Sequence, residues 1–258
     1  MKEEIKSNRP FYDFAFTYNL YEKLKELADL AEEEDWSYKN SPFDHENPVL
    51  FYYFHNTFER IFEQNKIVYS KDNEFCCFNT GLVTDNQEPI FALFKKNQPD
   101  RKEHWFLLQF CREGQWDMAK FAKLPDIATY FDDPSCLVYD SNLDLRVNYE
   151  HIIEDNKERF PSPYNTYDDH HLNLVLDGAI RKAKERVRRN YKVAVPQFYK
   201  GKIQLLLPLC LSNPKIADMA LLVQHHGDFY LASTCLTLDM AYNNARQLAK
   251  PDKDWLQP

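Results

Sequence analysis

The chain has 258 residues, enough for one large or two small domains, and 44% of them are hydrophobic. It can therefore bury a sizeable core and is not disordered. Its 40 acidic and 32 basic residues give a net charge of −8, which excludes a uniformly basic coat for nucleic acid but leaves room for a local basic patch.

The first half of the chain predicts two helices and then an antiparallel meander. Apolar residues recur at helical spacing from Phe14 to Leu30 and, after a break at residues 40–48, again from Leu50 to Phe62. The next segments are rich in β-branched and aromatic residues and are separated by turn clusters with Asn and Asp. The four strands that we expect cover residues 67–70, 74–83, 89–95 and 104–111.

The second half mixes helices and strands in no regular order. A strand is possible over residues 136–139, and the apolar spacing predicts helices at 150–159, 171–191 and 238–249, with strands at 202–210, 218–225 and 229–235. Helices and strands do not alternate as they do in a parallel sheet. We therefore expect a single α+β domain with a mostly antiparallel sheet flanked by helices.

Several common functional classes lack their motifs here. Only five glycines occur, where average usage predicts roughly 18, and no two are close enough to cradle a phosphate in a P-loop or Rossmann turn. The six cysteines never form C-x-x-C, and neither H-E-x-x-H nor G-x-S-x-G occurs. No signal-type segment or 18-residue apolar run is found. We expect a soluble, cytoplasmic protein with free cysteines in its core, no metal and no organic cofactor.

Paired histidines are weak candidates for a metal site. Residues 168–171 read Asp-Asp-His-His, and His225 is followed by His226. Neighbouring histidines on a strand point to opposite faces, so each pair offers one ligand to a given site. A helix start and a turn explain both pairs more simply.

Several blocks in the chain resemble an uncharacterised family, domain of unknown function 3825. They are NYKVAVPQ at 190–197, LLLPL at 205–209, TLDMAYNNAR at 237–246 followed by Trp255 and Leu256, FNTGL at 78–82, and HIIEDN at 151–156 with RFP at 159–161. The resemblance implies one module over residues 47–258. Residues 1–46 lie outside the resemblance, and we expect them to form a helical extension that packs on this module. The resemblance also implies an association with RNA, because in larger proteins such modules occur beside RNA-handling domains. This co-occurrence of domains is an association and shows no mechanism.

The terminal helix carries the first candidate site. Asp239, Tyr242, Asn243 and Arg246 follow one another at i, i+3, i+4 and i+7, beside the apolar stripe of the helix, with Asn244 next to them. An Arg oriented by a carboxylate can hold a phosphate or a base edge. The alternative is a structural network that ties this helix to the sheet.

The helix over 171–191 carries the second candidate site. Seven basic residues oppose only Glu185 between residues 181 and 192. Arg181, Lys184, Arg188 and Lys192 share one flank, whereas Lys182, Arg186 and Arg189 lie opposite the apolar stripe. Such a strip attracts a phosphate backbone, although charge runs are usually solvated faces, and we expect the flank set to reach a site before the outward set.

His151 is the only candidate for proton transfer. Its spacing from Arg146, R-x4-H, is that of some helix-pair ribonucleases, in which His is the acid or base and Arg steadies the phosphate. The pattern fixes only two positions, and a lone His is more often structural. Polar residues that would contribute to substrate binding are Asn156, Arg159, Gln197, Lys200, Asn79 and Thr80.

These residues lead to three functional hypotheses. The first is an RNA- or nucleotide-handling enzyme acting at phosphate, of phosphoesterase or RNA-end hydrolase type, with His151, Arg246 and Asp239 in catalysis and the helix cations on the phosphate. The second is a non-catalytic RNA-binding module, and the third is a protein-interaction scaffold. A deep pocket joining Arg246, Asn243 and distant segments would favour the enzyme, and an open groove would favour strand binding.

Overall fold

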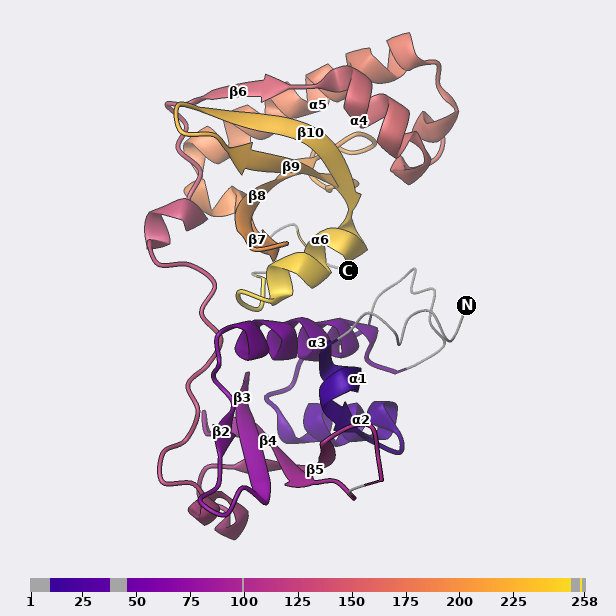
Figure 1. The fold of residues 1–258 in the computed structure, drawn as a ribbon. Coiled ribbons are helices and arrows are strands. Elements are labelled where there is room, and N and C mark those ends of the chain that lie inside the picture. Colours follow the sequence, from indigo (N-terminus) through magenta and orange to yellow (C-terminus); the bar gives the residue numbers. More distant parts are fainter. Residues whose placement is uncertain (1–9, 38–45, 99, 252–255, 257–258) are drawn as a thin grey trace. The chain divides into compact units, whose positions relative to one another are not determined.

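A computed structural model describes residues 10–37, 46–98, 100–251 and 256 (Figure 1). The break expected at 40–48 lies mostly outside these residues, and Trp255 lies wholly outside them. The chain divides into two compact units, the first ending at Thr129 and the second beginning at Tyr130. Each unit is described by itself, and the boundary expected between residues 46 and 47 falls inside the first.

The first unit contains a five-stranded sheet in the order β1-β5-β4-β3-β2. Strands β2 to β5 pair antiparallel with their chain neighbours, as the predicted meander requires, whereas β1 pairs parallel with β5. The elements are α1 (Pro10–Phe14), β1 (Ala15–Phe16), α2 (Leu20–Leu30), α3 (Pro48–Glu63), β2 (Val68–Tyr69), β3 (Phe75–Val83), β4 (Pro89–Lys96), β5 (Trp105–Arg112) and the 3-10 helix η1 (Trp116–Lys120).

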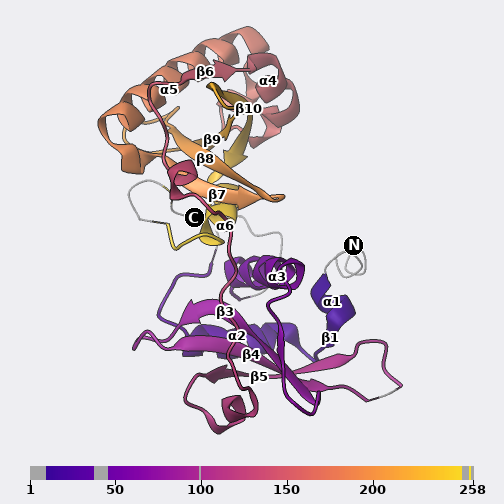
Figure 2. The ribbon, with the colours of Figure 1, turned by 60° about the vertical axis from the view of Figure 1, so that its left-hand side comes forward.

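Both faces of this sheet are covered. Figure 2 shows α3 along one face, where Phe54 and Phe58 pack on Phe78 of β3, and α1 and α2 pack against α3. On the other face Phe91 of β4 belongs to an apolar cluster with Met118 of η1. The alternation of β4 between these two faces explains why its sequence is almost continuously apolar.

The helix predicted over 14–30 is wrong in its first part. Phe14 ends α1, and the chain extends into β1 before α2 begins at Leu20. The side chain of Asn19 starts α2 by accepting hydrogen bonds from the amides of Tyr21 and Glu22, at 3.1 and 3.4 Å. An Asn at this position is a strong helix-start signal, and it outweighs the apolar spacing that runs across it.

The second unit contains another five-stranded sheet, in the order β6-β10-β9-β8-β7. Its pairs are antiparallel except for β6 with β10. The elements are η2 (Pro134–Leu137), β6 (Asp144–Val147), α4 (Tyr149–Asn156), η3 (Lys157–Arg159), η4 (Tyr164–Thr166), α5 (Asp169–Arg189), η5 (Tyr191–Val193), β7 (Val195–Tyr199), β8 (Lys202–Leu209), β9 (Met219–His225), β10 (Phe229–Thr237) and α6 (Leu238–Arg246).

Helices lie on both faces of this second sheet (Figure 1). Ile152 of α4 and Leu176 of α5 join one core cluster with Leu205, Leu207 and Leu209 of β8. Side chains alternate along a strand, so Gln204 of β8 points to the opposite face. Helix α6 packs on that face, where it contacts β7.

The α+β class and the mostly antiparallel sheets flanked by helices are confirmed, but the strands form two sheets instead of one. The strand expected over 136–139 is wrong, because residues 134–137 form η2, with Pro134 in its first turn and Asp133 as its cap. Strands β1, β6 and β7 were not expected. Among the described helices, none combines the length and apolar character that crossing a membrane would require.

Candidate nucleic-acid interface

Helix α5 is the longest described helix, and local signals position it. Asp168 starts it by accepting a hydrogen bond from the amide of His171 at 3.0 Å, and its apolar stripe, including Leu172, Leu176 and Val187, is buried in the core of the second unit. Three arginines lie in its last turn, where cations complement the helix dipole. The dipole does not explain the cations one or two turns earlier.

Three residues of the flank set, Arg181, Lys184 and Arg188, are exposed along α5, and we call them the basic row. Lys192, the fourth, lies beyond α5 in η5. Arg181 forms an ion pair with Asp177 at 2.6 Å, while the hydroxyl of Tyr149 donates to the same carboxylate at 2.9 Å. Tyr149 and then Arg181 hold the pKa of Asp177 below its ordinary value. Within the described part of the chain, Lys184 and Arg188 form no ion pair and so remain available to a ligand.

Two residues of the outward set have described partners. The guanidinium of Arg186 is half-buried and donates to Sγ of Cys210 at 3.0 Å, and Arg189 pairs with Glu185 at 3.6 Å. Lys182 is exposed. Which of the two sets contacts phosphate stays a prediction.

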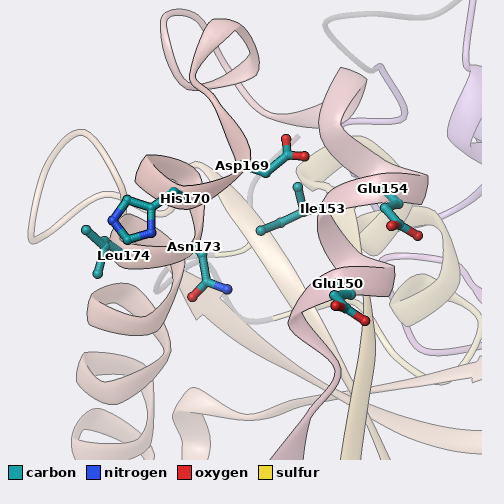
Figure 3. A pocket seen from close by; sticks show the side chains of 7 residues that line it. All are labelled: Glu150, Ile153, Glu154, Asp169, His170, Asn173 and Leu174. Carbon is teal, nitrogen blue, oxygen red and sulfur yellow. The ribbon is translucent and has the colours of Figure 1, made fainter.

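A pocket at the other end of α5 has the opposite charge (Figure 3). Its volume is about 400 Å³, and it is lined from α4 by Glu150, Ile153 and Glu154 and from α5 by Asp169 and His170, among others. Three carboxylates would repel a phosphate, although Lys157 pairs with one of them, Asp169, at 2.6 Å. Phosphate contact by α5 stays a prediction, and these carboxylates disfavour it at the N-terminal end of the helix.

The polar residues of α6 are mostly buried. Asp239 is 7% exposed, Tyr242 6% and Arg246 8%, and Asn243 is half-buried. Thr237 caps the helix by accepting from the amide of Met240 at 3.3 Å. This degree of burial fits the structural alternative better than a surface for a polymeric phosphate.

Two residues predicted to bind substrate, Asn244 and Gln197, take part in a row of hydrogen-bonded side-chain amides. Asn244 of α6 donates to the side-chain oxygen of Gln197 on β7 at 3.3 Å, and Gln197 donates to Gln204 on β8 at 2.8 Å. Gln197 has no exposed surface and Gln204 is 9% exposed. These two hydrogen bonds connect α6 to β7 and β8 of the sheet.

His151 does not meet Arg146 in any described contact. Its side chain is 48% exposed, and its Nδ1 lies 3.0 Å from Asp155 on the same helix. The guanidinium of Arg146 on β6 instead lies 3.8 Å from the ring centroid of Phe229. The spacing R-x4-H here places one residue on a strand and the other on the following short helix, so it does not form a pair.

Asn156 and Arg159 form a structural bridge. Asn156 is 2% exposed and accepts a hydrogen bond from Arg159. The same guanidinium nitrogen donates to the backbone oxygen of Cys235 at 3.0 Å. These bonds join η3 to β10, and none of them involves His151.

The other predicted polar residues lie on other elements than α5. In the first unit, the buried side chains of Asn79 and Thr80 bond to backbone groups: Asn79 accepts from the amide of Gly81 at 2.9 Å, and Thr80 donates to the oxygen of Ile90 at 2.7 Å. Lys200 lies at the exposed turn between β7 and β8, 5.3 Å from the ring centroid of Tyr199. Their part in substrate binding stays a prediction.

Asp177 and Tyr149 are the residues of this region that we did not single out. Asp177 precedes Arg181 by four residues, and this spacing predicts a helical ion pair. Tyr149 carries no such local signal because α4 brings it from 28 residues away. Among the described residues, no three His, Cys, Asp or Glu side chains are grouped to hold a metal ion.

The chain matches the model of a known protein family. Residues 27–255 match the family described as a domain of unknown function (DUF3825). No curated protein and no solved structure gives a significant match. Because the match spans most of the 258 residues, the chain belongs to the DUF3825 family.

Proposed function

We propose that this protein binds RNA non-catalytically, with the C-terminal half of α5 lying along the phosphate backbone. The observation that carries the proposal is the pair Lys184 and Arg188, which are exposed and form no ion pair with the described residues. Members of the family occur beside RNA-handling domains in larger proteins. This co-occurrence also supports RNA binding, but only as an association.

The charge distribution supports a local site on an acidic protein. Residues 1–129 contain 16 basic and 23 acidic residues, a net charge of −7, whereas residues 130–258 contain 16 basic and 17 acidic, a net charge of −1. Between residues 181 and 192, seven basic residues oppose one acidic residue. When such a cluster contacts the phosphates, counterions are released from the nucleic acid, and this release favours binding.

The enzyme hypothesis has less support. His151 would have to move a proton near a phosphate, yet its described polar contacts are with Asp155 and Asn148. Arg246 and Asp239 are both buried, and the pocket in Figure 3 is lined by carboxylates. A phosphoesterase or RNA-end hydrolase needs an acid or base and phosphate-binding cations around one reacting atom.

The proposal includes the cytoplasm as the place of action, as expected from the sequence. All six cysteines are free thiols, and thiols persist in reducing compartments.

The test is the salt dependence of RNA binding. Anisotropy of a labelled single-stranded RNA is measured with the full protein between about 50 and 200 mM salt, where each phosphate contact adds about 0.7 to the slope of log affinity against log salt. Replacing Lys184 and Arg188 by Gln should lower the slope by about 1.4 and weaken binding at every salt concentration.

The matched control replaces Lys182 and Arg189 by Gln. It removes the same two charges from the same helix but from the outward side, and we expect the slope to change by less than half as much. A basic-row variant that keeps the parental slope, or equal effects of the two doubles, would contradict the proposal. RNA cleavage that His151→Ala abolishes would return the enzyme hypothesis to first place.

A further inference from the structure

The first unit has an open pocket whose walls are aromatic rings. It measures about 600 Å³, and its lining includes Phe14, Phe62, Tyr69 and Trp105 together with Asp13 and His104. The rings come from four elements: α1, α3, β2 and β5. Phe62 is 49% exposed and Tyr69 48%, so rings that could have joined the core instead face solvent.

The rings adjoin one another in a series. Ring centroids are 5.7 Å apart for Tyr69 and Trp105, 6.1 Å for Trp105 and Phe14, and 6.2 Å for Phe14 and Phe62. Phe14 is nearly parallel to Trp105, at 22°, and steeply inclined to Phe62, at 73°. Because neighbouring centroids are about 6 Å apart, one small group in the pocket can lie within about 6 Å of more than one ring centroid.

The charge at the pocket favours a cation. Ring faces are electron-rich and attract a cation within about 6 Å of the centroid. Asp13 adds a carboxylate at the rim, and its ion pair with Lys102, at 3.4 Å, joins two exposed side chains, which is a weak interaction in water. The whole first unit carries a net charge of −7.

We propose that this pocket binds a methylated ammonium group, either of a small choline-like molecule or of a methylated lysine in a peptide. Such groups are large, weakly hydrated cations, and aromatic walls with an acid at the rim are the surroundings that bind them. The site is independent of the RNA contact on α5, since it uses different residues and a ligand of opposite charge.

A nucleobase is the competing occupant, and the spacing disfavours it. A base inserted between two rings needs about 7 Å between them, twice the van der Waals contact distance. Phe14 and Trp105, the nearly parallel pair, are 6.1 Å apart. The acidic surroundings would also repel the phosphates that accompany a base.

The test compares choline with 3,3-dimethylbutan-1-ol, which has the same shape but a carbon in place of the charged nitrogen. Calorimetric titration of the full protein should give saturable millimolar binding of choline, and binding of the neutral isostere at least about tenfold weaker. Tetramethylammonium should bind as well, because it keeps the charged group alone.

Variants then locate the site. Phe62→Leu and Tyr69→Leu remove a ring at half-exposed positions, and each should weaken choline binding by about threefold or more, whereas Tyr69→Phe should bind like the parent. Asp13→Asn should also weaken it. The matched control is Tyr18→Leu, which removes an 83% exposed ring outside this pocket, and it should change nothing.

Three results would overturn the proposal: no saturable choline binding at millimolar concentration, equal affinity for the isostere, or adenosine monophosphate binding that Phe62→Leu abolishes. Titration with a peptide that carries trimethyllysine, and with the same peptide carrying unmodified lysine, distinguishes a methylated peptide from a choline-like small molecule as the source of the ammonium group. Tighter binding of the trimethylated peptide than of choline supports a peptide ligand, and equal binding supports a small molecule.

Discussion

Gly81 occupies a position in β3 that a side chain cannot share. Its φ is +75°, and a Cβ there would lie 2.6 Å from the hydroxyl of Tyr53, which donates a hydrogen bond to the oxygen of Thr80 at 3.0 Å. The pairing of β3 with β4 shifts register between Asn79 and Val83, as at a β-bulge. A glycine in the left-handed region is common there.

Replacing Gly81 by Ala should therefore destabilise the protein by about 1–3 kcal/mol, because both the backbone conformation and the contact with Tyr53 become strained. Gly178→Ala is the matched control: Gly178 lies inside α5 with nothing within 4 Å of a Cβ. It should stabilise the protein by up to about 1 kcal/mol. Urea unfolding measures both, and a neutral Gly81→Ala would contradict the assignment of strain.

At the scale of elements, α6 is the helix whose role most needs a test. Arg246→Lys keeps the charge but loses the planar fork of a buried guanidinium. We expect it to lower stability by about 1–3 kcal/mol, seen as a lower melting temperature, and to leave RNA affinity per folded molecule unchanged. Weaker RNA binding at an unchanged melting temperature would instead place Arg246 in the binding site.

The matched control for this experiment is Arg188→Lys. It makes the same chemical change at an exposed position of the basic row, so the melting temperature should stay constant. Its RNA affinity should change little, because phosphate contact depends mainly on charge.

The helices were predictable where apolar spacing and start signals agree. Residues 171–191 were expected to form a helix, and α5 runs from Asp169 to Arg189. Strands that are short or polar were missed: β1 has two residues, and β6 alternates half-buried with exposed side chains. β7 contains Pro196, which a strand tolerates here because it lies at the sheet edge.

The candidate site was predictable only in part, and for a physical reason. The cations of α5 are neighbours through helical spacing, so sequence alone places them together. The amide chain from Asn244 to Gln204 and the four-element aromatic pocket depend on tertiary packing. Division of the strands into two sheets is equally non-local, since residue spacing carries no information about which distant strands pair.

At the scale of the whole molecule, buried thiols in both units link stability to pH. Burial raises the pKa of Cys77 and Cys235 to about 12 and that of Cys111 to about 11, and it raises those of Cys76 and Cys210 as well. Unfolding returns these thiols toward 9.0. Between the two values the unfolded chain binds fewer protons than the folded chain, so stability falls as pH rises.

We therefore expect the free energy of unfolding to decline above pH 9, by about 1.4 kcal/mol per pH unit for each fully buried thiol. Urea titrations at pH 8, 9 and 10 in the presence of a reductant measure it. Cys77→Ala should flatten the decline, whereas Cys136→Ala, which removes an exposed thiol, should not. A stability that stays constant to pH 10 would contradict the burial of these groups.

The parallel strand β1 has a practical consequence for anyone who trims this protein. The family match begins at residue 27, but α1 and β1 lie before it. Phe11 of α1 is fully buried among Phe54, Phe58 and Phe94, and Ala15 and Phe16 pair with Trp105 and Phe106. A protein cut at the family boundary would uncover those rings and leave unpaired amide and carbonyl groups at the start of β5, an edge on which a second molecule can add a strand and begin to aggregate.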